Sequence, residues 1–143
     1  MRWAPVLLLV VLASVPVASA ASPNPCKVVT PADATKVLGV KVGAGKAQTL
    51  GLYESCFYSA GTKSLTVQTR QIDKADFVKS AKANPGPVAP LAGVGAGASA
   101  YTAAGGLSVL AWKNGNEVTF LYIGVTPPAA QKAALAKTAL GRA

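Results

Sequence analysis

Histidine is absent from this chain of 143 residues, and Asp and Glu together number only five. The missing imidazole removes the commonest general base, the commonest metal ligand and the base of the usual Ser-His-Asp triad. We therefore expect no catalytic residue, no metal site and no cofactor, and we expect that the protein is not an enzyme.

The few acids stand at positions that suit structural roles. Asp33, Asp73 and Asp76 lie where helices should begin, and a carboxylate there satisfies free amides and complements the helix dipole. Glu54 and Glu117 each open an expected strand. Two carboxylates can hydrolyse a glycosidic bond, but nothing in the sequence brings these two together. We expect both to be solvated strand ends, because acids are rarely buried without a partner.

A long apolar run occurs only near the N-terminus, where Arg2 precedes residues 6–12 and Ala18-Ser19-Ala20 follows. This arrangement is typical of a secretory signal peptide cleaved after Ala20. Prolines interrupt the run, which falls short of the roughly 20 apolar residues that a membrane anchor needs. We expect a secreted, periplasmic or cell-envelope protein with no stable membrane anchor after cleavage, and one domain over residues 21–143.

Cysteine occurs only twice, as Cys26 and Cys56. In an oxidising compartment an even pair is most simply a disulfide. Closing this loop of about 30 residues should stabilise the fold by roughly 3 to 4 kcal/mol.

Basic residues outnumber acids, with a formal net charge of +9 that falls to +8 once Arg2 leaves with the signal peptide. Export argues against a nucleic-acid partner. The lysines are scattered without a run of adjacent basic residues, so the charge serves solubility or attracts an anionic envelope polymer or lipid headgroup.

The first half of the chain predicts a helix followed by three strands. Thr30 and Asp33 form a helix-start pattern around Pro31, and Gly39 provides a stop, so a helix should span 31–38. Strand-like segments follow at 46–52, 53–59 and 64–70.

The second half predicts the same order. A helix begins at Asp73, strands cover 98–102, 107–113 and 117–125, and Asn114-Gly115 is a strong hairpin signal. A C-terminal helix should span 127–140 and stop at Gly141. The fold class is α+β, an antiparallel sheet with two or three helices packed on one face, possibly two α-β-β-β halves at 26–70 and 73–125.

A glycine-rich segment places Gly93, Gly95 and Ala98 at the spacing of a dinucleotide-binding fingerprint. That motif needs a central strand before it and a helix after it. Residues 85–90 are instead rich in proline, and the residues after Ala98 favour a strand. We expect the glycines to form a hinge that lets the second half of the chain lay its strands beside the first.

Three short motifs occur together: Cys26-Lys-Val-Val-Thr-Pro-Ala-Asp, Ser55-Cys56-Phe57-Tyr58 and Gly93-Val94-Gly95-Ala96-Gly97-Ala98. In these the chain resembles a family of small exported bacterial proteins and lipoproteins known only as a domain of unknown function. The resemblance implies that Cys26 and Cys56 are partners and that Gly93 and Gly95 form a turn into a strand, and it implies no catalytic residue. This chain lacks the lipid-bearing cysteine of many members.

Aromatic residues concentrate on the expected strands, and the final hairpin is apolar on both alternating faces. Either both faces are covered, or one is an exposed patch for a partner. Trp112, Tyr122 and Tyr101 are the candidate partner-binding residues. We expect a non-enzymatic binding domain that contacts a protein or a cell-envelope component. The alternatives are a small-ligand carrier with a pocket between sheet and helices, and an inhibitor of an extracellular enzyme.

Overall fold

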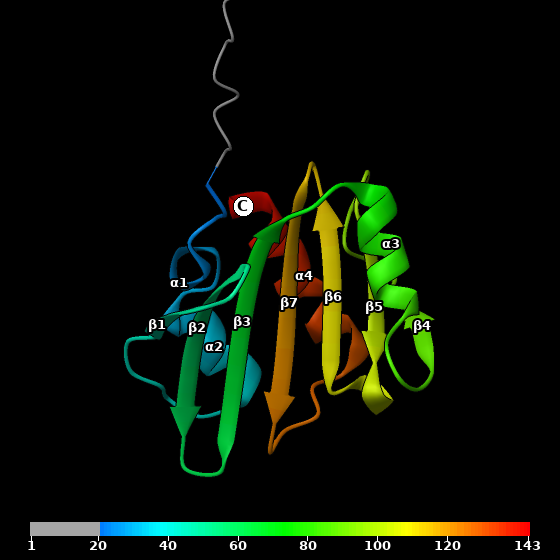
Figure 1. Ribbon diagram of the computed structural model, residues 1–143. Coiled ribbons are helices and arrows are strands. Elements are labelled where there is room, and N and C mark those ends of the chain that lie inside the picture. Colours follow the sequence, from blue (N-terminus) through cyan, green and yellow to red (C-terminus); the bar gives the residue numbers. More distant parts are fainter. Residues whose placement is uncertain (1–20) are drawn as a thin grey trace, which may run out of the picture.

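A computed structural model describes residues 21–143, so the expected signal peptide lies outside the described residues. Seven antiparallel strands form one sheet in the order β1-β2-β3-β7-β6-β5-β4 (Figure 1). The elements in chain order are α1 (Pro25–Val28), α2 (Pro31–Leu38), β1 (Lys46–Leu50), β2 (Tyr53–Ala60), β3 (Lys63–Gln71), α3 (Lys74–Lys82), β4 (Val88–Pro90), β5 (Ser99–Ala103), the 3-10 turn η1 (Ala104–Gly106), β6 (Ser108–Lys113), β7 (Asn116–Ile123) and α4 (Ala129–Arg142). The α+β prediction is confirmed.

The sheet consists of two meanders that meet at their last strands. β3 pairs antiparallel with β7 over eight residues, from Ser64 opposite Ile123 to Gln71 opposite Asn116. The first half has the expected three strands. The second half has a fourth, the short edge strand β4, which the sequence did not predict because Val88–Pro90 lies among prolines.

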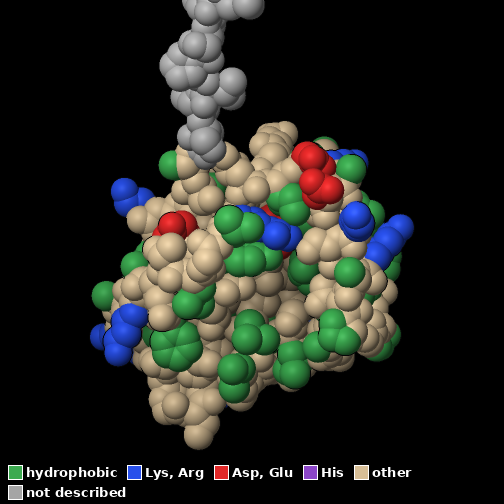
Figure 2. Space-filling model, viewed as in Figure 1, with side chains coloured by type: hydrophobic (Ala, Val, Ile, Leu, Met, Phe, Trp, Pro, Cys, Tyr) green, Lys and Arg blue, Asp and Glu red, His purple; other side chains and the backbone are tan. Residues whose placement is uncertain are grey.

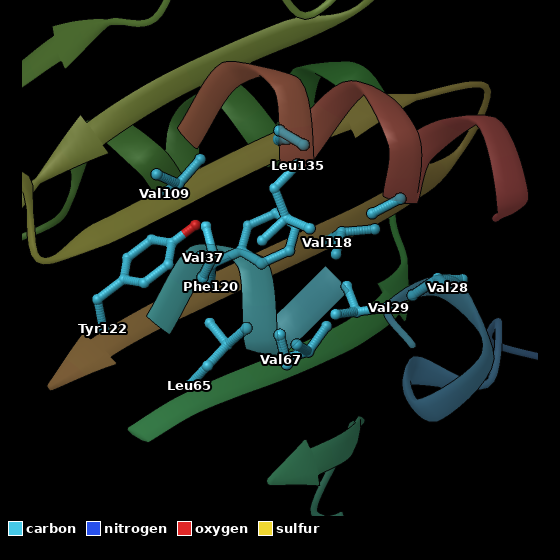
Figure 3. Close-up of a cluster of buried hydrophobic side chains, with 14 of the residues drawn as sticks. Val28, Val29, Val37, Leu65, Val67, Val109, Val118, Phe120, Tyr122 and Leu135 are labelled. Carbon is cyan, nitrogen blue, oxygen red and sulfur yellow. The ribbon is translucent and has the colours of Figure 1, made fainter. Parts of the chain in front are cut away.

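The main core lies between the sheet and helices α2 and α4, which cover one face of it (Figure 1). Val67 of β3, Val118 and Phe120 of β7 and Val109 of β6 point towards Val37 and Leu135 of the two helices (Figure 3). All four strand residues are fully buried. Two helices therefore pack on one face, as predicted, but the expectation that all helices share this face does not hold for α3.

Helix α3 packs on the opposite face, over β5 and β6 (Figure 1). Phe77 and Ala81 of α3 form a second buried cluster with Ala103 and Leu110. Because side chains alternate along a strand, Leu110 points away from its neighbours Val109 and Ala111, which belong to the main core. The apolar residues on both sides of β6 are thus covered by different helices.

Local chemistry explains the elements that the sequence predicted well. The Thr30 hydroxyl accepts from the Asp33 N–H while the Asp33 carboxylate accepts from the Thr30 N–H, and Gly39 ends α2 with φ +66°. Asn114 and Gly115 both have positive φ in the β6–β7 turn, as this type of hairpin requires. The disulfide between Cys26 and Cys56 is present and joins α1 to β2.

The expected limits of the C-terminal helix are wrong. Helix α4 begins at Ala129, after Pro128, and continues through Gly141 to Arg142. Arg142 donates to the Val28 carbonyl and pairs with Asp33 at 2.6 Å, so contacts with α1 and α2 hold the last turn where Gly141 alone would favour a stop. Within residues 21–143, no helix has the length and hydropathy to cross a bilayer.

The expected hinge at Gly93 and Gly95 is also wrong. Residues 91–98 join β4 to β5, two strands of the same half that pair antiparallel. Both glycines have positive φ, and their neighbours Leu91 and Val94 are buried in the main core. A Cβ on Gly93 would lie 3.5 Å from that of Ala133, so the loop folds against α4 rather than linking the two halves.

Candidate functional site

Helix α3 covers only part of its face of the sheet, and the central strands are left open beside it (Figures 1 and 2). We call the outward side chains of β2, β3 and β7 the open face. By strand register they are Tyr53, Ser55, Phe57, Ser59, Ser64, Thr66, Gln68, Arg70, Glu117, Thr119, Leu121 and Ile123. This surface combines residues from both halves of the chain.

One end of the open face is apolar. Thr66 of β3 pairs with Phe57 of β2 on one side and with Leu121 of β7 on the other. Ile123 follows Leu121 on the same face of β7. The exposed fractions of Phe57, Leu121 and Ile123 are 40%, 39% and 51%. We call these three residues the apolar row. Large apolar side chains grouped in this way are typical of an interaction site.

The other end of the open face is hollowed where it meets the C-terminal end of α3 (Figure 2). We call this hollow the α3 cleft. It has a volume of about 300 Å³ and is lined by Tyr53, Gln68, Ser80, Ala83, Asn84, Pro85, Leu110, Glu117 and Thr119.

Glu117, which lines the α3 cleft, belongs to a buried ion pair. Arg70 Nε donates to Glu117 Oε2 at 2.7 Å, and the Glu117 side chain is only 2% exposed. Thr119 donates to the other carboxylate oxygen at 3.0 Å, while Arg70 Nη2 donates to the Ser80 hydroxyl of α3 at 3.1 Å. The pair therefore ties β3, β7 and α3 together. Our expectation that Glu117 is a solvated strand end is wrong, because its partner on β3 allows it to be buried.

Tyr53 stacks on this ion pair. The Arg70 guanidinium carbon lies 4.8 Å from the centre of the Tyr53 ring, within the range of a cation–π contact. Partial burial and the nearby Glu117 carboxylate raise the pKa of the Tyr53 hydroxyl, and the Arg70 charge opposes them only in part. The hydroxyl is therefore protonated at neutral pH and can donate a hydrogen bond.

The three residues that the sequence singled out for partner binding lie elsewhere. Tyr122 is completely buried in the main core, where its ring extends from β7 towards the helices (Figure 3). It cannot contact a partner, so this assignment is wrong. Trp112 and Tyr101 are half-buried beside α3. The Trp112 indole donates to the Ile72 carbonyl at 2.8 Å, and Tyr101 packs against Phe77, so both help to hold α3 on the sheet.

The sequence analysis missed Phe57, Leu121 and Ile123 as surface residues. Leu121 and Tyr122 are neighbours on one strand and must point to opposite faces. Both side chains are hydrophobic enough to be buried, so only the pairing of β7 with β3 and β6 decides which of them points into the core.

Glu54 lies away from the cleft and accepts a hydrogen bond from Thr49 at 3.0 Å. The structure thus does not pair it with Glu117.

No group of three or more potential metal ligands occurs among residues 21–143. Comparisons with protein-family models, with characterised proteins and with solved structures gave no match. The resemblance to the family of exported proteins therefore stays a prediction, and function has to be argued from the open face itself.

Proposed function

We propose that this chain is an exported binding domain that docks an acidic protein partner on the apolar row of its open face. The observation that carries this proposal is that the apolar row is uncovered at the centre of the sheet, while every neighbouring apolar position of β6 is covered by a helix. An aromatic and two aliphatic side chains on rigid strands lose little entropy when a partner covers them.

The charge of the chain favours an acidic partner. The net charge is +8 without Arg2, and a field of this sign speeds the approach of an acidic surface. Lys46 lies directly opposite Phe57 on the edge of the open face, so a basic residue borders the apolar row. A protein with an apolar patch surrounded by carboxylates would complement both features.

Photo-crosslinking tests this proposal. A photoreactive phenylalanine analogue in place of Leu121 should crosslink the disulfide-bonded chain to one acidic protein of the cell envelope or culture medium. The same analogue in place of Leu52, which is 82% exposed in the β1–β2 turn outside the apolar row, is the matched control. We expect this control to give little of that product.

A second comparison separates contact from charge. Leu121→Glu and Leu52→Glu change the net charge equally, but only the first places a carboxylate inside the apolar row. We expect Leu121→Glu to abolish capture and Leu52→Glu to leave it close to wild type. Equal capture by the two variants, or crosslinks only to second copies of this chain, would refute the proposal.

A further inference from the structure

The α3 cleft contains more hydrogen-bonding groups than the fold uses. Gln68 donates through Nε2 to the Ser55 hydroxyl, and Asn84 donates through Nδ2 to carbonyls of α3. Arg70 uses Nε and Nη2. Within residues 21–143 this leaves the Oε1 atom of Gln68 and the Oδ1 atom of Asn84 without a protein partner, together with the Tyr53 hydroxyl. The cleft thus offers two acceptors and one hydroxyl that can both donate and accept a hydrogen bond.

The ion pair determines which charge a ligand can carry. Glu117 lines the cleft, and an anionic ligand there would compete with it for the Arg70 guanidinium and leave a carboxylate that is 2% exposed without its counter-charge. A cationic ligand would likewise compete with Arg70 for the Glu117 carboxylate. A neutral ligand leaves the pair intact, so the cleft favours neutral molecules.

Apolar surface completes the lining. Leu110, Ala83, Pro85 and the ring of Tyr53 contribute this apolar surface. A ligand that fits must therefore combine C–H surface with several groups that donate and accept hydrogen bonds. The hydroxyls of a sugar ring do both, and the ring also presents C–H faces. A volume of about 300 Å³ is at the lower end for ligand pockets, which suits one or two sugar rings.

We infer that the α3 cleft is a binding site for a neutral saccharide unit. Gln68, Asn84 and the Tyr53 hydroxyl bind its hydroxyls, and Leu110 contacts its C–H face. This site goes beyond the proposed function, because a sugar can occupy the cleft whether or not a protein docks on the apolar row.

An NMR titration of the isotopically labelled, disulfide-bonded chain tests this inference. The probes are the methyl glycosides of glucose, mannose, galactose and N-acetylglucosamine, with glucuronic acid as the charged counterpart of glucose. We expect at least one neutral glycoside to shift the side-chain amide signals of Gln68 and Asn84 in a saturable way. The amide of Gln131, which donates to Lys36 on the helical side of the molecule, should not move.

Matched threonine variants show whether the cleft holds the sugar. Thr119→Val removes a hydroxyl that donates to Glu117 inside the cleft, and Thr49→Val removes one that donates to Glu54 outside it, both at 3.0 Å. We expect Thr119→Val to weaken binding about threefold to tenfold and Thr49→Val to leave it unchanged. Tyr53→Phe, which keeps the ring on Arg70, should weaken binding similarly and covers the case in which Thr119→Val fails to fold.

Three results would overturn the inference. The first is that no neutral glycoside shifts the amide signals. The second is that glucuronic acid binds as tightly as the methyl glycoside of glucose, or more tightly. The third is that the two threonine variants weaken binding equally. None of them affects the crosslinking result at Leu121, so failure of the saccharide site and failure of the protein-docking proposal are distinguishable.

Discussion

The strongest test of the fold around the candidate site is to remove Arg70 and leave Glu117 buried. In Arg70→Met the carboxylate keeps only the hydrogen bond from Thr119, and α3 loses its bond to the guanidinium. Breaking one partner of a buried pair costs about 3 to 5 kcal/mol. Because the Arg70 side chain is 16% exposed and water can reach its place, we expect the lower end, about 3 kcal/mol.

The control is the other ion pair in the described residues. Arg142 and Asp33 are as close, at 2.6 Å, but their side chains are 40% and 22% exposed. Exposed pairs contribute about 0.2 to 1 kcal/mol, so Arg142→Met should cost no more than about 1 kcal/mol. Burial rather than distance should separate the two variants.

Urea unfolding followed by circular dichroism measures the difference. For a urea dependence of about 1.5 kcal/mol per molar, Arg70→Met should lower the midpoint by about 2 M. The double variant Arg70→Met/Glu117→Leu should recover much of this loss, because no charge is left buried. If Arg70→Met costs no more than Arg142→Met, or if the double variant is less stable than Arg70→Met, then Glu117 is not the buried charge that we describe.

Three further predictions concern the stability of the fold. Replacing both Cys26 and Cys56 by alanine should lower the free energy of unfolding by roughly 3 to 4 kcal/mol, measured by the same urea assay, because the loop between them spans 30 residues. In thermal unfolding, Gly61→Ala should lower the free energy of unfolding by about 1 to 2 kcal/mol, and Gly124→Ala should lower it clearly more. Both glycines have positive φ, but of the two only Gly124 would bring a Cβ into collision with a backbone atom, the Thr62 carbonyl oxygen. Equal losses for the two variants would contradict this reasoning. Burial raises the pKa of Asp33, but the Thr30 amide and Arg142 outweigh it and hold the pKa below its usual 3.8. A group whose pKa is lower in the folded state stabilises the fold above its unfolded pKa, so this contribution should disappear as the pH falls below about 4. Asp33→Asn should flatten that part of the stability profile, and an unchanged profile would count against it.

The parts of the fold that the sequence predicted are those decided by local chemistry. Thr30 and Asp33 satisfy each other's backbone amides within one turn of helix, and Asn114-Gly115 has the positive φ values that a two-residue hairpin turn requires. The disulfide followed from the count of cysteines and the expected export of the chain. None of these depends on how distant segments pack.

The parts that the sequence did not predict depend on pairing between distant strands. Glu117 was expected in solvent because its own neighbours offer no counter-charge, whereas Arg70 is 47 residues away in the chain. Tyr122 and Leu121 alternate on β7, and the pairing of β7 with β3 and β6 decides which of them faces the helices and is buried. The sequence also does not predict the face on which α3 packs, because a helix that precedes an edge strand can cross to either face of the sheet.

The open face therefore exists only when the two halves of the chain are joined. Tyr53, Gln68 and Arg70 come from the first half, and Glu117, Thr119 and Leu121 come from the second. The register between β3 and β7 places Arg70 opposite Glu117 and Thr66 opposite Leu121, so one strand pairing assembles both the α3 cleft and the apolar row. A variant that weakens this pairing should lose the saccharide and the protein partner together, whereas the side-chain variants proposed above should remove only one of them.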